Sequence, residues 1–404
     1  MAAMKRVPHA ARRIISEDLR THNRGLVLEE AFRRGTLSRG ALAQSTGLTG
    51  AAISRITREL IQAGLLKERS GTAGPSGPGR PTRELEFLPG GAYVVGVGIG
   101  AYEQWVQIAD LRGRSIARRP LHLRSLRTAE SALRNVVQEI KALAAAAAIA
   151  NRRIMGCGIA IAGLVDPASG TVLQSPNLGW RNVPVADRLG AALGAPVCVD
   201  AMHHALNLAE MRRTSAEDES VVLVNAAMGI GASVMLHGSV LRGGHAAAGQ
   251  IGHMRVAGAN DLCTCGRRGC LDTVASGYAV LRRLKAVESR KAPKEHDVKH
   301  ARRLMQIIGG DDRGAPGVLK ALFESGQQLG EALNIVARVL DPDRFVLAGP
   351  LAQTESYVAG VRSGLGASSP SLSVSVLTAD SAGAWLALSR FVLSSTLDLS
   401  RLRS

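Results

Sequence analysis

From Arg24 to Glu68 the chain repeats apolar positions with a helical period, and glycines interrupt this repeat three times. The pattern predicts a short helix that begins near Ser38, a turn at Gly47, and a longer helix capped by Thr49. Apolar positions at i, i+3 and i+7 predict the buried face of the longer helix, which is formed by Ile53, Ile56 and Leu60. The other face of that helix then exposes Ser54, Arg55 and Arg58.

A helix of this kind after a tight turn can lie in the major groove of DNA, where Arg and Ser side chains reach base edges and phosphates. We therefore predict a DNA-binding helix-turn-helix, and a plain helical bundle is the alternative. The candidate DNA contacts in these helices are Ser38, Arg39, Thr49, Ser54, Arg55 and Arg58.

Two short strands are expected next, in AGLLKERS and RELEFLP, and they would form the wing of a winged helix-turn-helix. The segment GTAGPSGPGRPT joins them and is rich in Gly and Pro. It is either a flexible linker or an arm that enters a minor groove, with Arg80 as the candidate contact.

Strands rich in Val and Ile alternate with helices after Pro89. The stretch AYVVGVGIGAYEQWVQIADLRG predicts two strands, residues 128–150 a helix, and RIMGCGIAIAGLVDP a further strand. This alternation predicts an α/β domain.

A chain of 404 residues with 46% hydrophobic content is long enough for two or three globular domains. Its N-terminal residues lack the apolar run of a signal peptide. The most apolar run, residues 142–150, is far shorter than the roughly 20 residues that span a bilayer. We expect a cytoplasmic protein with no membrane partner, in which the thiols stay reduced.

The net charge of +17 indicates an anionic partner or simply a solvated basic surface. Residues 1–85 carry 15 Lys and Arg against 7 Asp and Glu, a balance of +8. The basic excess is therefore concentrated in the part of the chain that is predicted to bind DNA.

Three longer stretches resemble a known family: GLVDPASGTVLQSPNLGW, MGIGASVMLHGSVLRGGHAAAGQIGHM and CTCGRRGCLDTVAS. Together they resemble the ROK family of sugar kinases and sugar-responsive repressors. The resemblance runs from HNR at His22–Arg24 to DPDRFVLAGP at Asp341–Pro350. It implies a winged helix-turn-helix followed by a two-lobed, actin-like (ribonuclease H-like) α/β domain.

The expected organisation has five parts. They are an extension (1–20), the winged helix-turn-helix (21–88), a first lobe (89–200), a second lobe with a zinc site and effector pocket (201–375), and a C-terminal helix that packs back on the first lobe (376–404).

Three of the five cysteines fall within CTCGRRGC, ten residues after His253. In the family this His and three Cys hold a structural zinc, so the expected ligands are His253, Cys263, Cys265 and Cys270. The donor types agree, because soft thiolates with one imidazole favour tetrahedral Zn²⁺. The alternative is a trio of reduced loop cysteines. Cys157 and Cys198, on expected buried strands, are predicted to be core residues.

Four motifs depart from those of the kinase members of the family. DIGGT reads GIGAY, with Gly98 in place of the Asp, and the Asn-Asp pair that contacts the sugar reads Ala201-Met202. Methionine cannot act as the general base. GTGIG reads AMGIG, with Met228 in place of the Thr. The later GGG reads AGP, where Pro350 lacks a backbone donor. These departures predict a protein that is not an enzyme and needs no ATP.

Other polar positions match family residues that hydrogen-bond sugar hydroxyls: Asn177, Gln250, His253 and Asp272. Gln250 replaces a Glu and keeps donors and acceptors without the charge. These residues form either an effector pocket or a vestigial one whose hydrogen bonds are only structural.

The resulting hypothesis is a cytoplasmic, nucleoid-associated repressor of carbohydrate genes that binds double-stranded operator DNA as a homodimer or tetramer and responds to a sugar. Two alternatives stay open at this point. One is an active sugar kinase with a DNA-binding appendage, and the other is a DNA-binding regulator that no longer senses a ligand.

Overall fold

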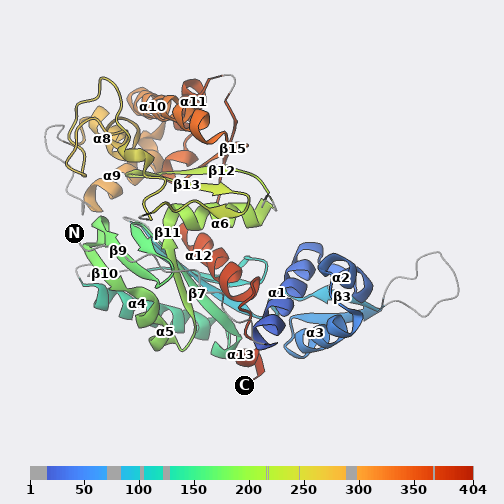
Figure 1. Ribbon diagram of the computed structural model, residues 1–404. Helices are drawn as coiled ribbons and strands as arrows, with labels where there is room; N and C mark the ends of the chain where they lie inside the picture. Colours follow the sequence, from blue (N-terminus) through green and yellow to red (C-terminus); the bar gives the residue numbers. More distant parts are fainter. Residues whose placement is uncertain are drawn as a thin grey trace. The chain divides into compact units, whose positions relative to one another are not determined.

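The computed structural model describes residues 16–70, 83–100, 104–121, 128–214, 216, 218–244, 246–287, 298–366 and 369–403. The described chain divides into two compact units (Figure 1). Unit 1 contains the residues up to Ala92 together with those from Ser389 onward, and unit 2 runs from Tyr93 to Leu388. Helices and mixed sheets alternate in unit 2, so the α/β prediction is confirmed.

In the N-terminal part of unit 1, the described residues between 16 and 87 form three α-helices and a small sheet of strand order β1-β3-β2. The helices are α1 (Ser16–Arg34), α2 (Arg39–Thr46) and α3 (Gly50–Gln62), and the strands are β1 (Thr36–Ser38), β2 (Leu66–Ser70) and β3 (Arg83–Phe87). Two helices with a tight turn between them and an antiparallel β2–β3 pair confirm the predicted helix-turn-helix and its wing strands. The joining loop, including Arg80, lies outside the described residues.

The C-terminal segment also belongs to unit 1 and contains the end of a π-helix (Leu388–Val392) and α13 (Ser400–Arg403). Four of its leucines are buried: Leu393, Leu397, Leu399 and Leu402. It approaches α1 closely at Gly25, where a Cβ would lie 2.1 Å from the carbonyl oxygen of Ser394. A residue with a side chain at position 25 would therefore displace this segment.

Lobe A of unit 2 is built on a five-stranded sheet of order β11-β7-β4-β5-β6, beside a three-stranded sheet of order β10-β9-β8. The strands are β4 (Tyr93–Ile99), β5 (Gln104–Asp110), β6 (Ser115–Pro120), β7 (Ile154–Ile161), β8 (Leu164–Asp166), β9 (Thr171–Ser175), β10 (Trp180–Pro184) and β11 (Val197–Ala201). Two helices, α4 (Ala129–Ala146) and α5 (Val185–Leu193), complete this lobe. The apolar stripe of α4 packs with the valines and isoleucines of the sheet in one core.

Lobe B is built on a second five-stranded sheet, of order β14-β13-β12-β15-β16. Its strands are β12 (Val221–Ala226), β13 (Ile230–Leu236), β14 (Ser239–Val240), β15 (Arg344–Ala348) and β16 (Ser371–Val374). Its helices are α7 (Asp272–Ala275), α8 (Gly277–Arg283), α9 (Val298–Gly309), α10 (Pro316–Leu340) and α11 (Glu355–Gly364).

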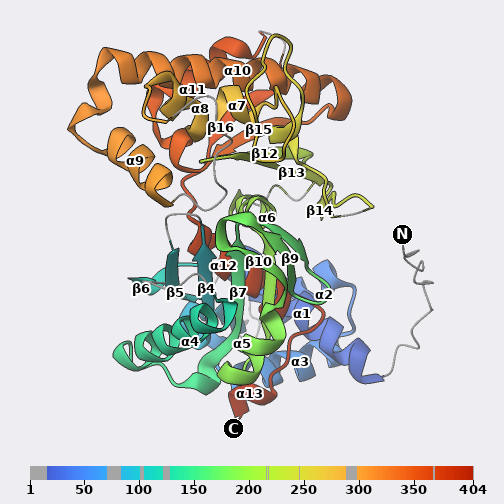
Figure 2. The same cartoon turned by 90° about the vertical axis from the view of Figure 1, so that its left-hand side faces the viewer.

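Two further helices connect the lobes, α6 (Met202–Thr214) and α12 (Ala379–Ala387). Figures 1 and 2 show α6 between the two five-stranded sheets, and α12 packs on α6, β4 and β7. Residues 376–404, expected as one helix on the first lobe, are divided in the structure. Helix α12 packs on lobe A, and the chain from Ser389 onward belongs to unit 1.

Strand β4 shows how the sequence positions α12. Side chains alternate between the faces of a strand, and here Val95, Val97 and Ile99 face the core with α4 while Gly96 and Gly98 face α12. The glycines let the helix lie directly on the backbone of the sheet. Among the described helices, none is long and apolar enough to cross a membrane.

Candidate functional site

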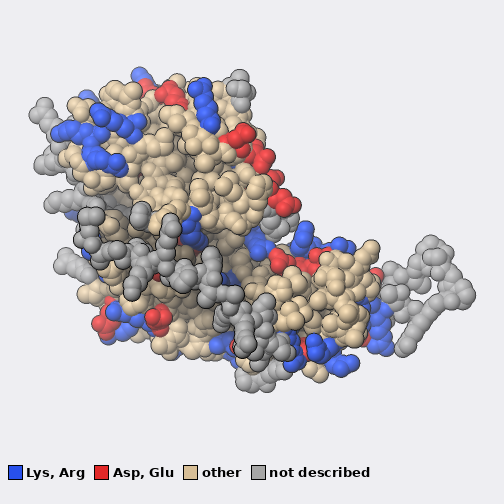
Figure 3. All heavy atoms as spheres, in the orientation of Figure 1, with Lys and Arg blue, Asp and Glu red and all other residues tan. Residues whose placement is uncertain are grey.

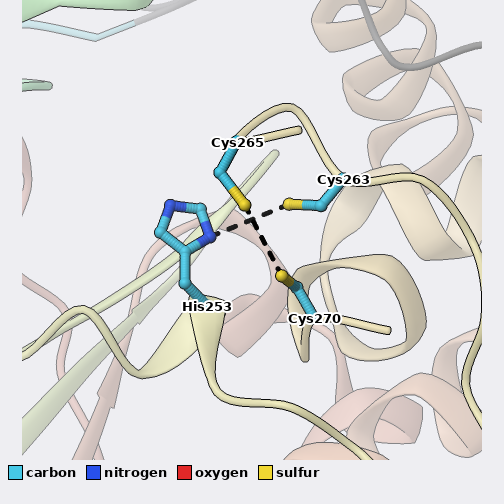
Figure 4. A group of neighbouring side chains, drawn as sticks. All are labelled: His253, Cys263, Cys265 and Cys270. Atoms are coloured by element: carbon cyan, nitrogen blue, oxygen red, sulfur yellow. Dashed lines mark hydrogen bonds between the residues drawn. The ribbon is translucent and has the colours of Figure 1, made fainter. Parts of the chain in front are cut away.

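The strongest candidate site is a cluster of one imidazole and three thiols in lobe B. His253 ends a 3₁₀ turn (Ile251–His253), and the cysteines come from the loop that leads into α7. Figure 4 shows the three sulfur atoms and one ring nitrogen of His253 directed toward a common centre. Cys263 Sγ lies 3.7 Å from His253 Nδ1, and Cys265 Sγ lies 3.6 Å from Cys270 Sγ.

These distances fit a tetrahedral metal site. Zn–S bonds near 2.3 Å and Zn–N bonds near 2.0–2.1 Å place neighbouring ligand atoms about 3.5–3.8 Å apart. The four donor atoms all lie within 4.8 Å of one another. Burial and the neighbouring thiols of Cys265 and Cys263 raise the pKa of Cys270 to about 12. A bound cation would reverse this effect by stabilising the thiolates.

Asp272 follows the last cysteine and lies beside the metal cluster. Its Oδ1 accepts a hydrogen bond of 2.7 Å from the backbone N–H of Ile230, and its Oδ2 lies 3.8 Å from His253 Nδ1. Burial raises the pKa of this carboxyl to about 6, although the backbone hydrogen bond and His253 act in the opposite direction. Asp272 thus presents a carboxyl group next to the turn Ala227–Ile230.

For the other two candidate sugar-binding residues, Gln250 and Asn177, the structure gives a place in the chain but no side-chain contact. Gln250 immediately precedes the 3₁₀ turn that carries His253, and its side chain is exposed. Asn177 lies in a 3₁₀ turn (Pro176–Leu178) of lobe A, and its side chain falls outside the described residues. The structure thus brings His253 and Asp272 together, with Gln250 close by in the chain.

The position at which the kinases carry an aspartate on the first strand is filled here by α12. A Cβ on Gly98 would lie 2.6 Å from the Cβ of Ala379 and 2.6 Å from the backbone nitrogen of Asp380. The start of α12 is held in place because Arg118 of β6 pairs with the buried Asp380, with Nε 2.7 Å from Oδ2. No side chain fits at position 98 unless this helix moves.

The other positions that depart from the kinases carry apolar residues. Ala201 ends β11 and Met202 begins α6, and both side chains are buried. Met228 packs against the core of lobe B, and Pro350 begins a 3₁₀ turn.

The residues beside Met202 reveal a contact that the sequence reasoning missed. Asp200 binds the guanidinium of Arg242 through both carboxylate oxygens, at 3.0 and 2.6 Å. His203 is enclosed next to Gly231, and burial lowers its pKa to about 3. The only signal in the sequence was a single Arg in the glycine-rich stretch LRGG, together with an acidic residue at a strand end that needs a partner.

In unit 1, helix α3 presents the predicted pattern. Ile53, Ile56 and Leu60 are fully buried, while the side chains of Ser54, Arg55 and Arg58 are exposed. Thr49 caps α3 and accepts a hydrogen bond from the N–H of Ala52, and Ser38 caps α2 in the same way through Ala41. The two predicted helix starts are confirmed.

Ion pairs fix α3 and the wing within unit 1. Glu59 of α3 is buried and pairs with Arg20 and Arg24 of α1. Burial alone would raise the pKa of Glu59, but the two guanidinium groups outweigh it and lower the pKa. Arg39 pairs with Glu68 of β2 at 2.7 Å, so this candidate DNA contact has a partner inside the unit.

Comparisons with known proteins agree with this geometry. The sequence profile of the ROK family matches residues 94–369. The xylose repressor of Caldicellulosiruptor bescii is 26% identical over 337 residues, which cover 81% of this chain and 83% of that protein.

Two solved structures are similar in fold. One is a ROK family transcriptional regulator described as a homologue of the Escherichia coli MLC protein, with a TM-score of 0.74 and 26% identity over 95% of this chain and 99% of that one. The other is a ROK family glucokinase from Streptomyces griseus in complex with glucose and AMPPNP, with a TM-score of 0.58 and 24% identity over 73% of this chain and 98% of that one. The regulator match therefore spans unit 1 as well as unit 2.

Proposed function

The chain belongs to the ROK family, and from this premise we propose that it is a DNA-binding repressor of carbohydrate genes whose operator affinity is controlled by a sugar or sugar derivative. One observation carries the proposal. A winged helix-turn-helix with exposed arginines on α3 is joined to a sugar-kinase fold in which α12 occupies the space beside Gly98. The similarity to a xylose repressor supports the carbohydrate assignment.

The proposed DNA contact is made by α3. It exposes Ser54, Arg55 and Arg58 on the side opposite the buried face, as a helix in the major groove requires. In a two-fold dimer, or a dimer of dimers, two such helices would bind half-sites about 34 Å apart, or a multiple of that distance. Such a protein acts on the nucleoid in the cytoplasm. On the face drawn in Figure 3, Lys and Arg side chains are present on both units.

The proposed sugar site is lined by Asp272, His253, Gln250 and Asn177. Zinc held by His253 and the three cysteines would fix the ring of His253, because Nδ1 faces the sulfur atoms and Nε2 points away from them (Figure 4). A metal-bound imidazole is oriented and can hydrogen-bond through its second nitrogen. A carboxylate with an imidazole and an amide is a suitable set for sugar hydroxyls.

A duplex that the full-length protein selects from a random DNA pool tests the proposal. The protein is expected to protect this duplex, and a sugar from a panel of D-xylose, D-glucose and N-acetyl-D-glucosamine is expected to shift its affinity by about 5- to 150-fold. Selection of no defined sequence would contradict the proposal. Binding without any shift would favour a regulator that senses no ligand.

The double substitution Arg55→Ala with Arg58→Ala is expected to weaken binding to the selected duplex by at least about thirtyfold, because each Arg–base contact contributes about 1–3 kcal/mol. Electrophoretic mobility shift at fixed salt measures this. The matched control is Arg134→Ala on α4, which removes an exposed guanidinium from unit 2. Equal binding by all three proteins would remove α3 from the DNA contact.

We further propose that the protein has no sugar kinase activity. We expect no sugar-dependent ATP turnover in a coupled assay with the same panel. We also expect none from Met202→Asp, because restoring the base leaves position 98 without room for a side chain. The Streptomyces griseus glucokinase with glucose is the positive control. Sugar-dependent ATP turnover by the wild-type protein or by Met202→Asp would contradict this proposal and favour the kinase alternative.

A further inference from the structure

Arg242 connects the two lobes of unit 2. It follows β14 of lobe B by two residues, and its guanidinium binds the carboxylate of Asp200 at the end of β11 in lobe A. The contact is bidentate, with NH1–Oδ1 at 3.0 Å and NH2–Oδ2 at 2.6 Å. Two parallel hydrogen bonds of this kind fix orientation as well as distance.

Asp200 depends on this partner because it has almost no access to water. Its side chain is 5% exposed, and that of Arg242 is 32% exposed. Burial alone would raise the pKa of Asp200, but His204 and Arg242 outweigh it and lower the pKa to about 2. His204, one turn into α6, places Nδ1 3.3 Å from Asp200 Oδ1 and 3.2 Å from NH1 of Arg242.

The backbone at Arg242 begins the loop that ends at the candidate sugar-binding residues. The carbonyl of Arg242 accepts a hydrogen bond of 3.2 Å from the N–H of Ala248. Gly249 has a φ of +86° and lies directly against β13, where its carbonyl accepts from the N–H of Ala232 at 2.8 Å. Gln250 comes next, and His253 follows three residues later. The side chain of Arg242 is thus bound to lobe A, while its loop delivers Gln250 within lobe B.

We propose that Arg242 is a positioning residue for the effector response: its ion pair with Asp200 holds residues 242–244 and 246–250, and with them Gln250 and His253, in a fixed place relative to β11 and α6. This proposal rests on the proposed sugar response for its functional part. A sugar bound at the loop then acts on lobe A through the ion pair. No such role follows from the kinase chemistry, because the neighbouring Ala201 and Met202 carry no catalytic group.

The test compares Arg242→Gln and Arg242→Lys with a matched control, Arg344→Gln. Arg344 and Glu219 also form a short ion pair, 2.6 Å from Nε to Oε2, but both residues belong to lobe B. Hydrogen exchange is measured for residues 197–204 and 242–253. Operator affinity without sugar, the half-maximal concentrations of D-xylose, D-glucose and N-acetyl-D-glucosamine for operator release, and zinc content are measured on the same proteins.

Arg242→Gln is expected to speed exchange in both segments and to raise the half-maximal sugar concentration by about tenfold or more, within the usual range of coupling between sites. Sugar-free operator affinity and zinc content should stay within about twofold, because unit 1 and the metal ligands are unchanged. Arg242→Lys keeps the charge and loses the bidentate geometry, so it should restore part of the response. Arg344→Gln should leave both segments unchanged.

If Arg242→Gln fails to fold because Asp200 is left unpaired, the double variant Asp200→Asn with Arg242→Gln removes both charges and is expected to show the same loss of response. Exchange and half-maximal concentrations like those of Arg344→Gln would overturn the proposal. A wild-type protein that answers to none of the three sugars would contradict the proposed sugar response, and the exchange of the two segments alone would then decide whether Arg242 positions the loop.

Discussion

Cys263→Ala is expected to abolish stoichiometric zinc binding and to lower the melting temperature of unit 2 markedly. Three remaining ligands cannot close a tetrahedral structural site, and zinc binding free energies on the order of 10 kcal/mol become folding free energy. Cys263 is buried, and the loop from Cys263 to Cys270 is joined to His253 through this cluster. Elemental analysis and differential scanning calorimetry measure the two effects.

Cys198→Ala is the matched control, because it removes a thiol of lobe A that lies outside the cluster. Its sulfur is 3.7 Å from the carbonyl of Cys157, and its loss should leave zinc content at one per chain. Full zinc content in Cys263→Ala would show that these four residues are not the metal site.

Zinc loss should also reduce the response to sugar while sparing the DNA-binding helix. His253 is both a candidate ligand of the metal and the neighbour of Asp272, so the ring loses its orientation when the metal is absent. The selected duplex should therefore still bind Cys263→Ala, with a weaker shift by sugar. If sugar shifts the duplex affinity of Cys263→Ala as much as that of the wild type, the loop from Cys263 to Cys270 has only a structural role.

The local features of unit 1 could be predicted because short-range physics determines them. Ser38 and Thr49 cap α2 and α3 through N–H groups three residues away, and the buried face of α3 follows from its period. The candidate metal ligands could also be predicted, because the family resemblance implies them and their donor types agree with a tetrahedral zinc site. Each of these signals comes from residues that are close together in the sequence.

Long-range contacts could not be predicted, because they depend on which elements the fold places together. The helical pattern leaves Arg39 outside the predicted buried face, yet Glu68 of the wing binds it. Asp200 and Arg242 lie 42 residues apart. Gly98 carries no sign in the sequence that α12, far along the chain, fills the space beside it. In each case the sequence shows the residue but does not show which distant element will lie against it.

Gly25→Ala is expected to lower the melting temperature of unit 1, and Gly40→Ala is expected to raise it. Both glycines lie in helices, where alanine is favoured by about 1 kcal/mol. At Gly40 the nearest atom to an added Cβ, the Oγ of Ser38, is 3.7 Å away, so only the helix preference acts. At Gly25 the Cβ would lie 2.1 Å from the carbonyl oxygen of Ser394, and overpacking costs about 1–3 kcal/mol.

Because the two substitutions are expected to change the melting temperature in opposite directions, together they test whether the C-terminal segment packs within unit 1, the proposed DNA-binding unit. Deletion after Leu388 should have the larger effect, because it removes the buried Leu393, Leu397 and Leu399, each worth about 1.5–3 kcal/mol of burial. Calorimetry and binding to the selected duplex follow both changes. An increase in melting temperature for Gly25→Ala would show that the segment does not pack on α1. If the decrease occurs, the chain that leaves α12 packs on α1 inside unit 1, so α12 is linked through this segment to the unit that carries the proposed recognition helix.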